Sequence, residues 1–81
     1  MEKMIQEVIS AIGGEGNISH CTNCITRLRL TLKDDSIADR QKVKNITGVF
    51  GIAETEEQFQ IVLGPKAAQT ASLINSTYNF S

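Results

Sequence analysis

The stretch of the chain from residue 23 to residue 30, which reads NCITRLRL, places a thiol just before a run of alternating polarity. In an extended strand Arg27 and Arg29 share one face, and the leucines beside them point to the other. The leucines will be drawn into a core, which leaves the arginines on the opposite face beside Cys24. Guanidinium groups favour a thiolate and bind carboxylates or phosphates through a planar fork. These residue types indicate a nucleophilic cysteine that reacts with, or carries, a small anionic group.

The elements that must position Cys24 follow from the spacing of apolar residues. Near the N-terminus these residues recur at helical spacing, and the glycine pair that follows them ends the helix. The apolar residues of this helix are Met4, Ile5, Val8, Ile9 and Ile12. Residues 17–23 are expected to form a short strand. Cys24 then falls in a turn before a second strand over residues 26–33.

The second half of the chain is expected to form a short helix, a hairpin and a last helix. Asp39 is a suitable N-cap for a short helix. Residues 49–53 and 58–63 predict two strands joined by an acidic turn. Pro65 is suited to the first position of a last helix, and residues 79–81 are expected to be a frayed tail.

The predicted order is α-β-β-α-β-β-α, with each pair of strands joined closely enough to form an antiparallel hairpin. We therefore expect an α+β fold, in which helices pack on one face of a four-stranded antiparallel sheet. A chain of 81 residues fits one domain, so we assign residues 1–81 to a single domain.

Composition excludes several function classes. The net charge of −1 argues against a nucleic-acid partner, and the positive charge is local, at Arg27, Arg29 and Lys33. No segment approaches the roughly 18 consecutive apolar residues that would insert into a membrane. The N-terminus alternates charged and apolar residues, unlike a secretion signal, so we expect a cytoplasmic location with reduced cysteines.

Each candidate residue also has a plainer interpretation. A free cysteine is commonly a small buried apolar residue, and exposed arginines are commonly solvated strand residues. Cys21 and Cys24 form a C-x-x-C pair, which is typical of a redox pair or half a zinc site. A zinc site needs about four ligands, and only His20 is added here, so we expect no metal. The pair precedes a strand, whereas a thioredoxin-type pair opens a helix, and we expect His20 at the surface.

The stretch around Cys24 resembles the phosphorylation-site motif of enzyme IIB domains in the bacterial phosphoenolpyruvate-dependent sugar phosphotransferase system, glucose superfamily. That motif reads roughly C-x-T-R-L-R. Four further elements match the family in the same order along nearly the whole chain: Gly13-Gly14, Asn17-Ile18, Gly48-Val49 with Gly51, and Gln60 to Gly64. The fold of this family agrees with the element order predicted above.

The resemblance implies that Cys24 accepts a phosphoryl group from a phosphohistidine of enzyme IIA and donates it to a sugar held in the membrane enzyme IIC. It makes Arg27 and Arg29 catalytic, mainly in transfer to the sugar, and requires no cofactor. It places Ile25, Thr26 and Gln60 in support of the phosphate. Strand propensity explains Thr26 equally well, and Gln60 fits a solvent-facing strand position equally well.

The resemblance extends to a sugar class and a location. The Gly-Gly element, the Cys21-x-Asn23-Cys24 spacing and the residues from Gly64 to Ala67 are most similar to domains specific for N-acetylmuramic acid, and next to the sucrose and β-glucoside group. The implied location is the inner face of the cell membrane, joined to or docked on enzyme IIC. The alternative function is a thiol redox or regulatory module that uses the pair Cys21 and Cys24.

Overall fold

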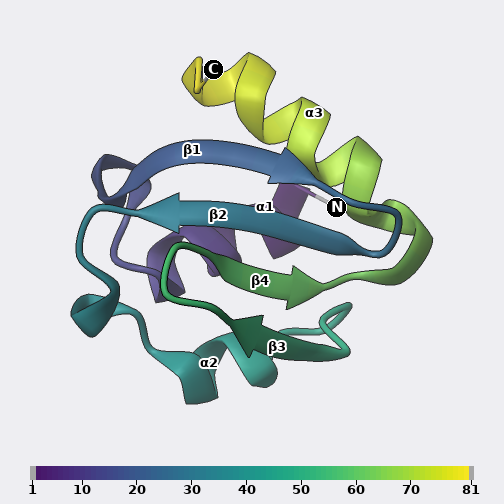
Figure 1. Cartoon of the computed structure of the whole chain (residues 1–81). Coiled ribbons are helices and arrows are strands. Elements are labelled where there is room, and N and C mark those ends of the chain that lie inside the picture. Colours follow the sequence, from purple (N-terminus) through teal and green to yellow (C-terminus); the bar gives the residue numbers. More distant parts are fainter. Residues whose placement is uncertain (1, 81) are drawn as a thin grey trace.

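The computed structural model describes residues 2–80, in which a four-stranded antiparallel sheet lies in front of the α-helices (Figure 1). The strand order is β1-β2-β4-β3, so β2 and β4 are central. The strands are β1 (Ile18–Asn23), β2 (Arg27–Leu32), β3 (Gly51–Glu54) and β4 (Phe59–Val62). The helices are α1 (Glu2–Ala11), α2 (Arg40–Lys44) and α3 (Ala67–Tyr78), with short 3-10 turns η1 (Glu15–Asn17), η2 (Asp35–Ile37) and η3 (Gly64–Lys66). The predicted fold class and element order are confirmed.

The alternation along β2 separates the core from the open face of the sheet. Leu28 and Leu30 are fully buried and pair in register with Ile61 and Phe59 of β4. These side chains face the helices, which contribute the rest of the core. Arg29 pairs with Gln60 and therefore shares the opposite face, which no helix covers in Figure 1. The helical spacing predicted for α1 is confirmed too, because its apolar residues are buried.

Element ends differ from the prediction by one or two residues, and hydrogen bonds explain why. Val49 donates its N–H to Ile46 (3.1 Å), which keeps it in the turn after α2, so β3 begins two residues later than expected. The predicted cap of α2 is confirmed, because the Asp39 carboxylate accepts from the N–H of Lys42 (3.0 Å). Of the tail expected at residues 79–81, Asn79 ends α3 with a left-handed φ of 59°, and residue 81 lies outside the described residues.

Asn17 fastens the end of α1 to the end of β2. Its side chain is buried, and its Nδ2 donates to the carbonyl oxygens of Ile12 (2.7 Å) and Asp34 (2.9 Å). Its Oδ1 accepts from the N–H of Asp34 (2.8 Å). One amide therefore satisfies three backbone groups that belong to two chain segments. A residue with another side chain leaves those buried groups without partners.

We predict that Asn17→Ala lowers the free energy of unfolding by about 2–4 kcal/mol, because up to three backbone groups lose their partner in a buried place. Urea denaturation measures this change. Asn45→Ala is the control, since Asn45 is exposed at the end of α2, and it should change stability by less than about 0.5 kcal/mol. Equal losses in the two variants would contradict the role given to Asn17.

Candidate functional site

The loop of residues 24–26 joins β1 to β2 at the right-hand end of the sheet in Figure 1. Cys24 begins the loop and closes it by donating its N–H to the carbonyl oxygen of Arg27 (2.9 Å). Cys24 is half-buried, Thr26 is exposed, and Ile25 is 88% exposed. The turn position expected for Cys24 is confirmed, and the loop projects its residues where a second protein can reach them.

The sulfur of Cys24 has three groups directed at it. They are the backbone N–H groups of Thr26 and Arg27 and the guanidinium of Arg29. Partial desolvation is the strongest single influence on this thiol and raises its pKa. The two backbone N–H groups and the guanidinium of Arg29 lower the pKa, the guanidinium also through its positive charge, and together they outweigh the desolvation. The pKa of the Cys24 thiol therefore lies below its ordinary value, as the sequence led us to expect.

The two arginines of β2 have different partners, which the alternating pattern alone did not indicate. The guanidinium of Arg29 lies near the sulfur of Cys24 and lowers the pKa of its thiol. Arg27 Nη1 instead donates to Oε1 of Gln60 (3.0 Å). The Nε of Arg29 is buried and has no hydrogen-bond partner among the described residues.

Gln60 lies in β4 beside Arg29 in register and is 6% exposed. The solvent-facing position left open by the sequence is therefore wrong for Gln60, because its side chain is covered. Its Nε2 donates to Oε1 of Gln58 (3.1 Å), while its Oε1 accepts from Arg27. A chain of side-chain hydrogen bonds thus runs along the open face of the sheet and fixes the Arg27 guanidinium.

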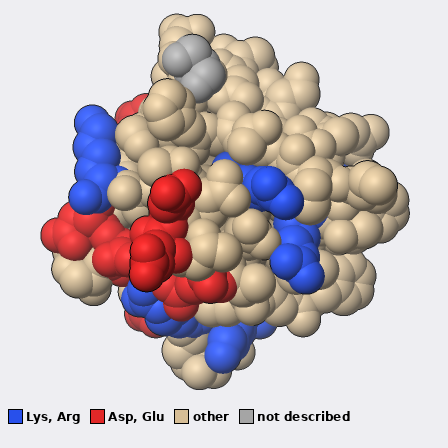
Figure 2. All heavy atoms as spheres, viewed as in Figure 1, with Lys and Arg blue, Asp and Glu red and all other residues tan. Residues whose placement is uncertain are grey.

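The basic residues do not all gather at one place. Figure 2 shows basic atoms right of centre on the open face of the sheet, apart from acidic atoms on the left. Lys33 was expected beside the arginines but follows the opposite end of β2, where its N–H donates to the carbonyl oxygen of Asn17 (2.7 Å). The expectation is wrong because the six residues of β2 carry Lys33 away from the loop.

The second cysteine belongs to the core. Cys21 pairs in register with Leu30, is 4% exposed and is a free thiol, as is Cys24. Burial raises the pKa of the Cys21 thiol to about 11, so it stays protonated at neutral pH. His20, one residue earlier, is exposed, and its expected surface position is confirmed.

Two features of the site were missed by the sequence analysis. The first is the pair of backbone N–H groups at the sulfur, which carry no side-chain signal. The second is Phe50, which is 75% exposed at the same end of the sheet, with its N–H bonded to the carbonyl oxygen of Val62 (2.9 Å). An aromatic residue between Val49 and Gly51 gave no indication of its exposure, because strand residues of this kind are usually buried.

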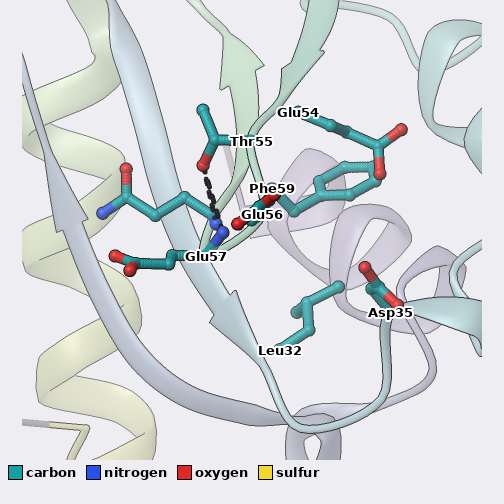
Figure 3. A pocket seen from close by; sticks show the side chains of 8 residues that line it. Leu32, Asp35, Glu54, Thr55, Glu56, Glu57 and Phe59 are labelled. Atoms are coloured by element: carbon teal, nitrogen blue, oxygen red, sulfur yellow. Dashed lines mark hydrogen bonds between the residues drawn. The ribbon is translucent and has the colours of Figure 1, made fainter.

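The opposite end of the sheet carries an acidic hollow (Figure 3). It is lined by Leu32, Asp35 and residues 54–59, and Thr55 closes the turn by accepting from the N–H of Gln58 (3.0 Å). A hydrogen bond from Arg40 holds the pKa of Glu54 below its usual range. Carboxylates repel small anions, so this hollow does not suit the chemistry of Cys24.

No three His, Cys, Asp or Glu side chains of residues 2–80 come together in a way that could hold a metal ion. None of the helices in this part of the chain has the length and apolar character that crossing a membrane requires.

The fold and the loop define a class: a small α+β domain that presents one activated cysteine at the end of an antiparallel sheet. The family model "phosphotransferase system, EIIB" matches residues 6–39. A crystal structure of one domain of the PTS system IIabc component from Clostridium difficile is also similar, with a TM-score of 0.86 and 34% sequence identity. That similarity covers 99% of this chain and 83% of the other. The chain belongs to the EIIB family of the phosphotransferase system, whose members are phosphotransferase components.

Curated relatives agree with this assignment. The N-acetylmuramic acid-specific EIIBC component of Aliivibrio fischeri is 61% identical over 69 residues, which are 85% of this chain and 14% of that protein. The N-acetylmuramic acid-specific EIIBC component of Vibrio vulnificus is 52% identical over 91% of this chain and 15% of that protein. The arbutin-, cellobiose- and salicin-specific EIIBC component of Escherichia coli is 41% identical over 82% of this chain and 14% of that protein. The chain thus spans about a seventh of the length of these relatives.

We predict that iodoacetamide alkylates Cys24 with a pH midpoint below the ordinary thiol pKa of about 8.5, measured on a Cys21→Ser background. Arg29→Ala should raise the midpoint more than Arg27→Ala, because the Arg29 guanidinium lies near the sulfur whereas Arg27 bonds Gln60. Added salt should raise the midpoint as well, since it screens the guanidinium charge.

Arg40→Ala is the matched control for this titration. Arg40 pairs with Glu54, a residue of β3 that lines the acidic hollow. Because this pair does not contact Cys24, the pH midpoint of alkylation should stay unchanged. Equal shifts in the Arg27 and Arg29 variants would contradict the division of partners described above.

Proposed function

We propose that this chain is a phosphoryl-carrier domain in which Cys24 accepts a phosphoryl group from a phosphohistidine of enzyme IIA and donates it to a sugar bound in the membrane enzyme IIC. The observation that supports this most is the arrangement at the loop. Two backbone N–H groups and the guanidinium of Arg29 surround a thiol at an accessible turn. Membership in the EIIB family supplies the reaction class in which such a thiol is useful.

The proposed chemistry is two displacements at phosphorus. The Cys24 thiolate attacks the phosphoryl group, so that an S–P bond forms while the N–P bond to the donor imidazole breaks. A sugar hydroxyl then attacks, an O–P bond forms, and the S–P bond breaks to return the thiolate. The hydroxyl proton passes to a base of the acceptor site. Positive charge and fixed N–H donors stabilise the phosphoryl oxygens in both transition states.

The two arginines take different parts in this proposal. Arg29 contacts the sulfur and stabilises both the thiolate and the phosphoryl group next to it. Arg27, held by Gln60, lies on the same strand face and would bind phosphoryl oxygens through its planar fork. Thr26 contributes its backbone N–H to the sulfur and has an exposed side chain beside the site. Ile25 projects from the loop and would contact a docked partner.

Partners, location and sugar are proposed from the relatives. Those described above are EIIBC components, which supports a membrane enzyme IIC as the acceptor partner and a position at the cytoplasmic face of the membrane. We propose N-acetylmuramic acid as the sugar, because relatives named for it reach 61% identity, against 41% for the arbutin, cellobiose and salicin relative. Residues 1–81 would act as one domain.

The alternative thiol redox module finds less support. A redox pair needs two thiols whose sulfur atoms can meet, and the Cys21 thiol is directed into the core, where burial raises its pKa to about 11. Cys24 is positioned at the surface and has a lowered pKa. The two cysteines therefore have separate environments in spite of the C-x-x-C spacing.

We predict that Cys24→Ser abolishes phosphoryl acceptance, while Cys21→Ser largely keeps it. Serine lacks the low pKa that makes the thiolate a nucleophile, whereas Cys21 is a core residue. Incubation with phosphoenolpyruvate, enzyme I, the histidine carrier protein and an enzyme IIA should add one phosphoryl group to the wild type, measured by mass spectrometry. Equal loss of phosphoryl acceptance in both variants would support a redox pair and contradict the carrier proposal.

We predict that Arg27→Lys and Arg29→Lys both keep acceptance from enzyme IIA but strongly reduce phosphorylation of the sugar. Lysine retains the charge but removes the planar fork. We expect donation to need the fork more than acceptance does, because in donation the charged phosphoryl group is transferred to a neutral hydroxyl. The measurement is sugar phosphorylation in vesicles that contain enzyme IIC, with Lys44→Arg, an exposed residue of α2, as the control. Donation at the wild-type rate in both variants would mean that the arginines are ordinary surface residues.

A further inference from the structure

The carbonyl oxygen of Thr26 accepts two hydrogen bonds from the turn after β4. The donors are the N–H groups of Leu63 (2.9 Å) and Gly64 (3.0 Å). This is a long-range connection, because the turn lies almost forty positions later in the chain. The Cys24 loop is therefore anchored to the segment that begins η3 and leads into α3.

The same peptide unit reaches the thiol from its other side. The peptide between Thr26 and Arg27 contains both the anchored carbonyl and the N–H of Arg27. No peptide bond among the described residues is cis, so this C=O and N–H point in opposite directions within one plane. The loop is closed by the bond from the Cys24 N–H to the Arg27 carbonyl oxygen (2.9 Å), and the Arg27 N–H is one of the groups near the Cys24 sulfur that lower the pKa of its thiol. Fixing the carbonyl at the turn thus aims the N–H at the sulfur.

Gly64 makes this geometry possible. Its φ is +68°, in the left-handed region that L side chains rarely adopt. A Cβ placed on Gly64 would also stand 3.3 Å from the ring of Phe50, which is tight. Any other residue here must either shift the backbone or displace that ring, and a shift of the backbone moves the two N–H donors that hold Thr26.

We propose that Gly64 is a positioning residue for the nucleophile: its left-handed turn holds two N–H groups on the Thr26 carbonyl and so aims the Arg27 N–H at the Cys24 sulfur. The proposal rests on the proposed function only in taking Cys24 as the nucleophile. Two donors on one carbonyl also polarise the peptide, which strengthens the hydrogen bond that its N–H donates. Gly64 acts through the Thr26–Arg27 peptide and does not touch the reacting atoms.

The test compares Gly64→Ala with Gly14→Ala, both on the Cys21→Ser background. Gly14 has a φ of +92° and nothing within 4 Å of an added Cβ, so it incurs backbone strain without any contact to the loop. Alkylation of Cys24 by iodoacetamide at pH 7 should be about threefold slower in Gly64→Ala, which corresponds to a rise of about half a pKa unit. Gly14→Ala should lower stability to urea and leave the alkylation midpoint unchanged.

Gly64→Asn gives the conservative variant, because asparagine enters the left-handed region more readily than alanine. Its alkylation midpoint should fall between those of the wild type and Gly64→Ala. It also carries the test if Gly64→Ala does not fold. An unchanged midpoint in a folded Gly64 variant, or the same shift in Gly14→Ala, would overturn the positioning role.

The readout separates this proposal from the carrier function. Alkylation needs no phosphoryl donor, so the midpoint can shift as expected even if the wild type accepts nothing from enzyme IIA. That result would support the positioning role of Gly64 and contradict the carrier proposal. Phosphoryl acceptance by the wild type, together with an unchanged alkylation midpoint in Gly64→Ala, would support the carrier proposal and contradict the role of Gly64.

Discussion

The alternation of side chains along β2 is the constraint on which the rest of the structure depends. β2 is central in the sheet, so its leucines must enter the core between β1 and β4. Once Leu28 and Leu30 are buried, Arg27 and Arg29 can only occupy the open face. A register slip of one residue would bury two guanidinium groups, at a cost no domain of this size could offset. The burial of the leucines, which stabilises the sheet, therefore also positions the two arginines on the open face.

Much of the fold could be predicted from the sequence, because periodicity and turn residues are local signals. The helical spacing in α1, the glycine pair after it, the Asp39 cap and the two hairpins all appeared as short patterns. The arrangement within the site was harder to predict. The Arg27 contact with Gln60 spans 33 positions, and it exists only because β4 pairs with β2 in one register. Spacing placed both arginines beside the thiol, whereas the structure gives that contact to Arg29.

Backbone groups explain the rest of what the sequence could not predict. The N–H groups near the Cys24 sulfur belong to the backbone, whose direction no side-chain pattern indicates. Their direction depends on the loop, which depends in turn on a glycine in another segment. Asn17 shows the same principle in the core, where one amide satisfies backbone groups of two segments. Short family motifs such as Asn-Ile and the late glycine thus have physical reasons in backbone geometry.

The exposure of Ile25 and Phe50 around a single thiol has a consequence for the order of events. Under the proposed function, donor and acceptor would both approach the same few residues at one end of the sheet, so the two partners would exclude one another. A carrier of this kind would alternate between them, releasing one before it meets the other, which is the kinetic pattern of a ping-pong exchange. Such a shuttle gains nothing from tight complexes, because a slow dissociation would limit every cycle. Two exposed apolar side chains would suit brief encounters of this kind.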